Sequence, residues 1–367
     1  MLSDEFKNLF SLDGYSSIVR SSNPFVKLVW LVMSIVLVTF GLVSVTGNIN
    51  EFWKRDVVTN IQTVDDEFPV IFPAISLCPF PPTKLKDFLL HSTFDNKAIS
   101  IDSKEYTIYT YKGNQTCYII NSIRSQILNK SESLTTNKED SQNGLRFLLY
   151  IKSDIQFLGY SANYPNELPE QREILNPITI GASNSINLNK KVHLKLGEPY
   201  SRCRDDLNME DSFDSDLYRD TVKTGYSYRR VNCYNLCYFK HVSLQDTGIK
   251  EFEKRKCDEF CPLECRITKY DVDNDVFYHR GLYKEMFYKN ISSKYNLSNL
   301  TLDEFTESYT DVIFYFKKLE YVQILESARI SESSLMSNVG GTLGIFLEVS
   351  FLSAYRSIDY LMRYFFN

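Results

Sequence analysis

Two long apolar stretches stand near the ends of this 367-residue chain, and a mostly polar region separates them. Residues 28–46 contain no charged side chain, and residues 25–46 are rich in valine, leucine and isoleucine. A helix of roughly 20 apolar residues crosses the hydrocarbon core of a bilayer. The pattern predicts two transmembrane helices, 25–46 and 335–363, that flank one large domain, 47–334.

The second apolar run contains residues that a simple anchor would not need. Besides three glycines it holds Glu348, Ser350, Arg356 and Asp359. Charged groups at membrane depth are costly and usually face a partner or a water-filled path. The run is therefore more typical of a pore wall than of an anchor.

The first apolar run is interpreted as a retained helix rather than as a cleaved signal peptide. The tail before it (1–24) carries several carboxylates, the run is long, and no small-residue cleavage site follows. Basic residues accompany both runs, and the positive-inside tendency then predicts cytosolic tails at 1–24 and 364–367. Residues 47–334 would lie outside the cell, which implies the plasma membrane.

The eight cysteines all fall within 47–334. An even count in one polar region is typical of a disulfide framework in an oxidising compartment. Zinc is the weaker interpretation, because Cys233-x3-Cys237 lacks the usual two-residue gap and no histidine follows at ligand distance. Five N-x-S/T sequons share the region and predict a glycosylated extracellular surface: Asn114, Asn129, Asn290, Asn296 and Asn299.

Within the large domain the periodicity is mainly that of strands. Residues 146–151 and 178–196 alternate apolar and polar side chains, and 311–325 predicts a strand pair or one long strand. Residues 252–265 predict a helix that leads into a cysteine-rich turn. Residues 79–145 are mixed and polar, and we expect an irregular or helical insertion there. The fold class is α+β.

Composition excludes some functions. A net charge of −5 argues against nucleic acid as a partner. The four histidines are scattered, and no nucleophile–base pair or metal-ligand cluster is apparent, so the sequence predicts no enzyme, no cofactor and no metal ion. Seven carboxylates lie between residues 205 and 220; we interpret them as a solvated helix face, with a proton or Ca²⁺ sensor as the alternative.

Five motifs then occur in a fixed order. They are Phe72-Pro-Ala-Ile-Ser-Leu-Cys78, Pro199-Tyr-Ser-Arg-Cys203, Cys233-Tyr-Asn-Leu-Cys237, Cys261-Pro-Leu-Glu-Cys265, and the segment from Leu335 to Ser350 with Asp359-Tyr360 beyond it. In these motifs the chain resembles the epithelial sodium channel/degenerin family, which includes acid-sensing and peptide-gated channels. The resemblance covers both apolar runs and most of the region between them.

The resemblance implies a stimulus-gated trimer, built with itself or with related subunits, whose second spans line a sodium-preferring and often amiloride-sensitive pore. It also implies a β-rich, disulfide-stapled extracellular domain with a helical thumb. Two rival interpretations remain: a non-conducting auxiliary subunit of such a channel, and a two-span receptor or adhesion protein without a pore.

The pore residues are assigned from the same resemblance. Ser337 matches the position that needs a small side chain near the gate, and Asn338 and Gly341 would line the gate beside it. Gly340 and Gly344 would let helices approach closely, although small-residue packing in a non-conducting bundle is the alternative.

The selectivity filter is where the chain departs from the family. The family's Gly-x-Ser is here Glu348-Val349-Ser350, and the carboxylate that usually follows is Arg356. A ring of carboxylates favours cations and binds divalent ions. Asp359 lies three positions after Arg356 and is a possible ion-pair partner; Glu348 pairing off-axis with Arg356 is the alternative. We expect weakened selectivity, or a subunit that needs others to conduct.

Further roles rest on the same resemblance. The family's His-Gly gating dipeptide corresponds to Asp13-Gly14, for which a plain turn is the alternative. Trp53 or Phe52 would contact Tyr200 at the wrist and couple the domain to the gate, unless these aromatics only anchor the membrane interface. The implied disulfides are Cys203–Cys265, Cys233–Cys261 and Cys237–Cys257, which leaves Cys78 with Cys117.

Overall fold

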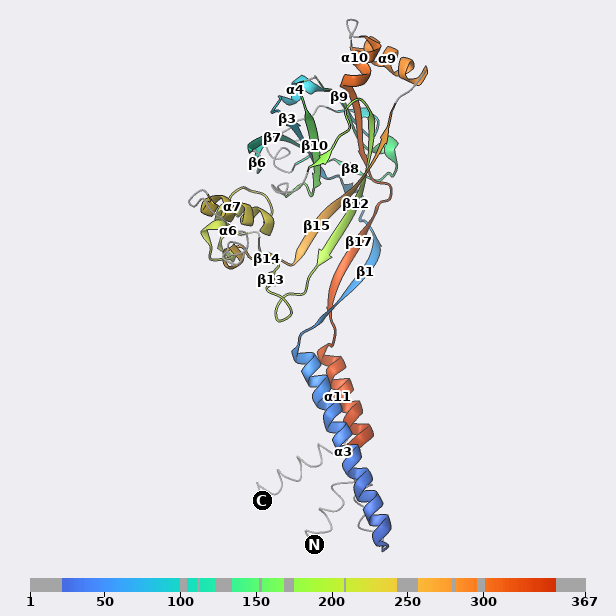
Figure 1. Cartoon of the computed structure of the whole chain (residues 1–367), viewed down its shortest axis with the longest axis vertical. Coiled ribbons are helices and arrows are strands. Elements are labelled where there is room, and N and C mark those ends of the chain that lie inside the picture. The colour runs from blue at the N-terminus through green and yellow to red at the C-terminus, as the bar shows by residue number, and fades with distance from the viewer. Residues whose placement is uncertain are drawn as a thin grey trace. The chain divides into compact units, whose positions relative to one another are not determined.

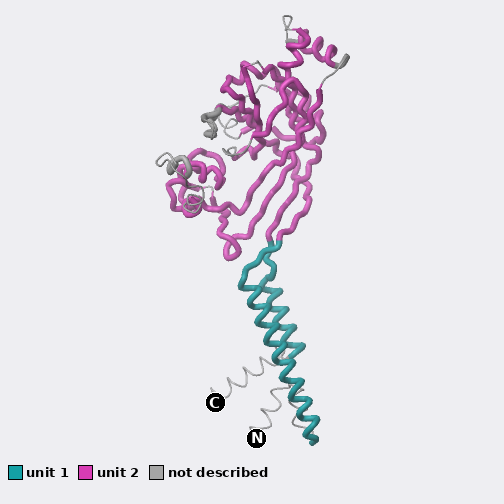
Figure 2. Tube along the Cα trace, viewed as in Figure 1, with its two compact units in different colours: residues 1–58, 327–367 teal, residues 59–326 magenta. Residues whose placement is uncertain are grey.

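A computed structural model gives the elements drawn in Figure 1. It describes residues 22–99, 104–110, 113–122, 134–151, 154–167, 175–207, 209–242, 257–278, 282–295 and 301–347. The chain divides into two compact units, which Figure 2 colours separately: residues 1–58 with 327–367, and residues 59–326. The first unit holds the two long helices, and the second holds the sheets.

Two helices build the first unit: α3 (Pro24–Trp53) and α11 (Glu332–Leu347). The side chain of Asn23 accepts a hydrogen bond from the Phe25 amide at 3.0 Å and caps α3, with proline in the first turn, where it is favoured. The Ser331 hydroxyl accepts from the Ser334 amide at 3.1 Å at the start of α11. Both helices therefore begin at side-chain caps.

The helix α3 is longer than the predicted span, because residues 47–53 continue it. It is the one helix, among the residues that the structure describes, long and apolar enough to cross a membrane, with a mean hydropathy of 2.6 over an 18-residue window. Only the first part of the predicted 335–363 span lies in described chain, and this part is helical.

An eight-stranded sheet is the frame of the second unit. Its order is β1-β17-β12-β16-β9-β4-β5, and β15 pairs with β12. The bounds are β1 Val57–Asp65, β4 Leu89–Phe94, β5 Lys97–Ala98, β9 Leu145–Tyr150, β12 Ser183–Leu194, β15 Arg266–Phe277, β16 Tyr309–Tyr315 and β17 Glu320–Ala328. The strands predicted at 146–151 and 178–196 are confirmed.

Strands β16 and β17 act as one long strand with a break. Antiparallel β15 pairs with the full length of β12, so β16 and β17 share its other edge, one after the other and both parallel to it. At the break the Lys317 amide donates to the Asn187 side chain at 3.1 Å, which replaces a ladder bond. The prediction of extended chain over 311–325 is confirmed.

A five-stranded sheet contributes the other half of the core. Its order is β11 (Asn176–Pro177), β10 (Phe157–Asn163), β3 (Ala74–Phe80), β7 (Gly113–Ile120) and β6 (Lys104–Thr110). The expectation of an irregular or helical segment over 79–145 is wrong. In its described residues (79–99, 104–110, 113–122 and 134–145) this segment consists mainly of strands, including β8 (Thr135–Thr136), which pairs with β2 (Val70–Ile71). The one α-helix described there is the single turn α4 (Leu85–Phe88).

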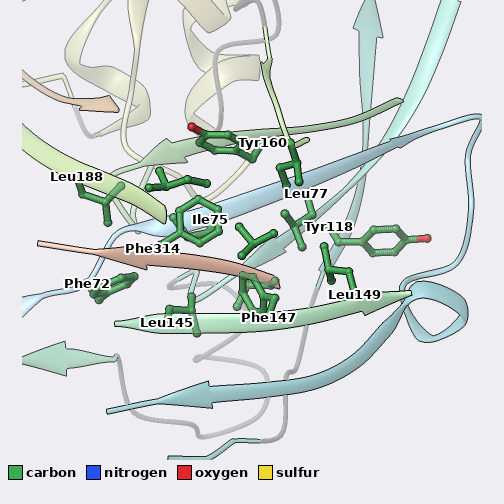
Figure 3. Packing of buried hydrophobic residues seen from close by; sticks show 14 of the residues in the cluster. Phe72, Ile75, Leu77, Tyr118, Leu145, Phe147, Leu149, Tyr160, Leu188 and Phe314 are labelled. Carbon is green, nitrogen blue, oxygen red and sulfur yellow. The ribbon is translucent and has the colours of Figure 1, made fainter. Parts of the chain in front are cut away.

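Aromatic side chains from both sheets fill the core (Figure 3). The ring of Phe314 lies edge-on to Phe147 and to Tyr160, with centroids 5.9 Å and 5.2 Å apart. Phe72 packs in the same way on Phe94 at 5.2 Å. Edge-to-face geometry is favoured between aromatic rings, and such pairs add to the free energy gained by burial.

Residues 203–265 form a small helical subdomain that we call the thumb. It contains β13 (Cys203–Arg204), η2 (Glu210–Ser212), α6 (Asp216–Val222), α7 (Arg230–Val242) and β14 (Leu263–Glu264). Residues 257–260 form a helical turn before the cysteine-rich segment, as predicted for 252–265. The helices α9 (Leu282–Tyr295) and α10 (Leu302–Ser308) pack on Tyr309 at the start of β16.

Candidate pore site

The two helices of the first unit pack through one stripe of α3. The buried residue of α3 is Gly41, and the half-buried Ser34, Ser44 and Asn48 share its helical face. α11 packs against α3, and the rings of Phe40 and Phe346 lie 5.7 Å apart. Small and polar residues are typical of contacts between helices in membranes, because they let backbones approach. The large apolar side chains of α3 are mostly exposed.

The helix α11 has two different faces. Leu335, Val339 and Phe346 are half-buried, as expected for the side that packs on α3. Ser337, Gly341 and Gly344 recur at spacings of four and three on the opposite side, where all three are exposed. Four of the residues assigned to the pore from the sequence (these three and Asn338) thus share the exposed side.

Nothing in the described chain requires glycine on α11. A Cβ atom added to Gly340, Gly341 or Gly344 meets no atom within 4 Å. Glycine in a helix interior costs roughly 0.5–1 kcal/mol relative to alanine. Three such residues weaken a helix without any advantage to packing inside the chain. Close approach of a neighbour outside the chain would supply the reason.

Other predicted site residues are only partly described. Glu348, Val349, Ser350, Arg356 and Asp359, and the tail residues Asp13 and Gly14, lie outside the described residues. Trp53 belongs to the first unit and Tyr200 to the second. Their contact at the wrist stays a prediction.

A sequence profile of one family matches most of the chain. The family is described as amiloride-sensitive sodium channel, and the matched residues are 6–97 and 81–360. The chain belongs to this family. It comprises the epithelial sodium channels and degenerins, and it is a family of ion channels rather than of enzymes.

Curated relatives agree with the profile. The chain is 24% identical over 323 residues to the epithelial sodium channel subunit gamma of Mus musculus, with 77% of this chain and 47% of that protein covered. The Homo sapiens gamma subunit is 21% identical over the same length and coverage. The chain spans about half the length of these relatives. The structure of a proton-activated chloride channel matches with a TM-score of 0.41 and 7% sequence identity. The match covers 93% of this chain and 97% of that one, and it is too distant to support a functional conclusion.

In this family member all eight cysteines are bonded in pairs. The bonds are Cys78–Cys117, Cys203–Cys265, Cys233–Cys261 and Cys237–Cys257. They are the three pairs that the resemblance implied and the pair that these left over, Cys78 with Cys117. Three of them lie in the thumb, whose hydrophobic core is small and consists of residues such as Leu217 and Tyr218 with the buried cysteines. Disulfides stabilise small domains of this kind, whose cores are too small to do so alone.

The acidic run of the thumb is a solvated surface. All seven carboxylates between Asp205 and Asp220 belong to exposed residues. Asp206 accepts hydrogen bonds from Arg204, which lowers the pKa of that carboxyl group below its usual range. Arg219 pairs with Asp214 and Asp216. No cluster of three metal-ligating side chains occurs in the part of the chain that the structure describes. These contacts favour the solvated face over the sensor.

The histidine of β12 lies in a basic environment. Half-buried His193 stands on β12, and its pKa is lowered by burial and then by Lys269, Lys195 and Lys191. Register places Ile267 of β15 and Ile324 of β17 beside it, on the same face of the sheet. Asp271 acts in the opposite direction, but burial and the three lysines outweigh it, so the neutral imidazole is favoured. No group of three metal-ligating side chains occurs among the described residues.

Three residues or groups were not found from the sequence. The helix contact at Gly41 could have been predicted, because Gly41 is the one glycine within the apolar run at 25–46. No sequence feature predicted the cation–π contacts of Arg55, since they depend on a left-handed backbone at φ 54°. No sequence feature predicted the ion pairs of Arg229 either, because its partners Glu167 and Glu264 are distant in the sequence.

The sequon at Asn290 yields a direct prediction. Asn290 is exposed on the outer side of α9, so an oligosaccharide can be attached without unfolding. We expect Asn290→Gln to remove one endoglycosidase-sensitive mobility step from the protein expressed in eukaryotic cells. Asn166→Gln, which alters an asparagine outside any sequon, is the control. An unchanged ladder in Asn290→Gln would show that this site is not used.

Proposed function

We propose that the chain is a subunit of a trimeric, stimulus-gated, sodium-preferring cation channel of the plasma membrane. Both tails (1–24 and 364–367) would lie in the cytosol and residues 47–334 outside. The trimer would form with itself or with related subunits. The proposal rests on the family and on the exposed side of α11.

The observation that carries the proposal is the position of the small residues on α11. Ser337, Gly341 and Gly344 lie away from α3, and no atom of the described chain contacts an added Cβ at either glycine. Three copies of this side around one axis would place their backbones close together. Backbone carbonyls and small side chains are the usual lining of a narrow ion path.

Residues beyond α11 would set the ion preference. Glu348, Val349 and Ser350 would form the filter, and Arg356 with Asp359 would place further charge along the same path. Glu348 and Arg356 replace a glycine and a carboxylate of the family pattern. This departure favours a second candidate function, an auxiliary subunit that conducts only beside others.

Cysteine substitution tests the pore directly. All eight native cysteines are in disulfides, so an introduced cysteine is the only free thiol of the chain. We expect a charged thiosulfonate reagent to reduce the current of Gly341→Cys and Gly344→Cys, because both positions would face the ion path. Val339→Cys and Leu343→Cys, on the side toward α3, are the matched controls.

Two outcomes would contradict the proposal. Equal modification on both sides of α11 would mean that the helix does not line a pore. Surface crosslinking with an amine-reactive reagent should also give a ladder that ends at the trimer. A ladder that ends at the monomer would instead support a receptor or adhesion protein.

A further inference from the structure

The two tryptophans of the chain lie on the same helix. They are Trp30 and Trp53, and the second is the last residue of α3. At 1.5 Å of rise per residue their separation of 23 positions corresponds to about 34 Å. The hydrocarbon core of a bilayer is about 30 Å thick. Tryptophan is enriched at both membrane–water interfaces, and this spacing suits one tryptophan at each.

Both rings are available to lipid. Trp30 is 43% exposed and Trp53 is 68% exposed. The midpoint between them falls near Gly41, the residue at which α3 is buried. The contact stripe with α11 would therefore be centred in the membrane, as expected for a helix pair that crosses it.

The outer end of α3 is built as a compact aromatic and basic group. The rings of Phe52 and Trp53 lie edge to face at 6.2 Å. The Arg55 guanidinium lies 4.2 Å from the centroid of Phe52 and 5.5 Å from that of Trp53. Lys54 between them is exposed. We call residues 52–55 the outer belt.

A left-handed residue shapes the outer belt. Arg55 has φ 54°, a region that residues other than glycine seldom adopt. A residue in this conformation commonly ends a helix, and the Arg55 amide donates to the Phe52 carbonyl at 3.2 Å. The turn folds the guanidinium back over the two rings. A glycine would end the helix as well, but it would bring no cation there.

We propose that the outer belt binds the phosphate groups of outer-leaflet phospholipids. The hydrocarbon core would then cover about residues 31–51 of α3. This membrane-embedded segment begins and ends several residues later than the apolar run at 25–46. Arg55 and Lys54 supply cations for the phosphodiester, and the guanidinium in particular matches phosphate geometry. The two aromatic rings supply surfaces that partition to the headgroup level.

The polar residues of α3 suit this register. Asn48 is half-buried on the stripe that packs against α11, so its amide does not face lipid. Asn50 and Glu51 fall at the outer boundary, one turn from Trp53, and Lys27 falls among the inner headgroups. The inference relies on the proposed function only in treating α3 as a transmembrane helix, and no step of it requires conduction.

Fluorescence of a single tryptophan tests the register. Trp30→Phe leaves Trp53 as the one indole of the full chain, which is placed in phosphatidylcholine nanodiscs. We expect quenching by a lipid labelled near the headgroup to exceed quenching by a lipid labelled deep in its acyl chain, a ratio above one. Quenching by aqueous iodide with no effect of either labelled lipid would overturn the proposal, because the belt would then stand clear of the membrane.

A second pair of variants tests the phosphate contact. Arg55→Gly keeps the left-handed turn and removes the guanidinium, and we expect iodide access to Trp53 to increase. Lys54→Gln removes the other cation of the outer belt and leaves Arg55 over the two rings, so it should increase iodide access by a smaller amount. In digalactosyldiacylglycerol nanodiscs, which lack phosphate, the Trp30→Phe protein with Arg55 and the same protein with Arg55→Gly should become alike. A difference that persists there would mean that Arg55 orders the rings without binding phosphate.

Discussion

Replacing Arg229 by methionine is expected to remove most of the protein from the cell surface. The Arg229 side chain is 5% exposed, and its guanidinium lies 3.2 Å from the Glu167 carboxylate and 3.6 Å from that of Glu264. It also donates to the Thr268 carbonyl at 3.3 Å. Removal of one member of a buried charged group costs about 3–5 kcal/mol, because the remaining charges stay buried without the opposite charge that balanced them.

The position of Arg229 explains why the loss should be global. Arg229 directly precedes α7 of the thumb, Glu167 follows β10, and Glu264 belongs to β14. One side chain thus joins segments from three parts of the second unit. A change of this size equals a large fraction of the total stability of a domain.

The thumb supplies a matched control for Arg229. Arg219 also binds two carboxylates, those of Asp214 and Asp216, but these partners are 100% and 89% exposed. Exposed ion pairs contribute little to stability, so Arg219→Met should leave surface expression and the thermal midpoint unchanged. Equal loss in both variants would mean that burial of the Arg229 group is not the cause.

A double substitution separates charge from packing. Arg229→Met/Glu264→Gln removes one of the two buried carboxylates along with the arginine. We expect its thermal midpoint in detergent, measured by fluorescence-detected size exclusion, to exceed that of Arg229→Met. A midpoint no higher than that of Arg229→Met would attribute the loss to the missing side-chain volume.

The long strand shows what the sequence was able to predict. Residues 311–325 were predicted to be extended because apolar and aromatic side chains dominate them. Val312 and Phe314 of β16 belong to the core, whereas β17 is half-buried along its whole length. The break at 316–319 was not predicted, since it depends on the Asn187 side chain reaching the Lys317 amide from another strand. The local sequence pattern therefore predicted extended backbone there, and a contact with another strand determines where the strand is interrupted.

Residues 79–145 were misinterpreted for a related reason. Polar side chains and sequons dominate this segment, yet β4, β5 and β9 belong to the eight-stranded sheet, β6 and β7 to the five-stranded sheet, and β8 pairs with β2. Several of these strands pair with segments that are distant in the sequence, such as β7 with β3 and β4 with β9, and a local pattern does not record such pairing. Cys117 is informative only after its pairing with Cys78 is known, and that pairing was predicted as the one left over once the three family pairs were assigned.

The pore residues depended on the family in the same way. A helix with small residues at 337, 341 and 344 has many uses, and the sequence alone left packing in a bundle open. The structure adds that these residues lie on the side opposite α3. Helix periodicity would have predicted that they share a side, but not that α3 packs on the other one.

Ser337→Trp is expected to produce a sustained sodium current. Ser337 is exposed on the proposed pore side of α11, and a bulky indole there would prevent three helices from closing together. Whole-cell current is measured in Na⁺ and then in an impermeant cation, and it should fall in the second solution. Val36→Trp places the same bulk on a 52% exposed position of α3 and should give no current.

Silence of Ser337→Trp at the cell surface would leave two explanations, which Glu348→Gly distinguishes. Restoring the family glycine removes a carboxylate from each of three subunits at the proposed filter. Current that appears only in Ser337→Trp/Glu348→Gly would identify Glu348 as the obstruction and support an auxiliary subunit whose pore is intact but blocked. Silence of the double variant as well, in a protein that crosslinks to the trimer, would locate the obstruction elsewhere on the path, where Arg356 is the next residue to replace.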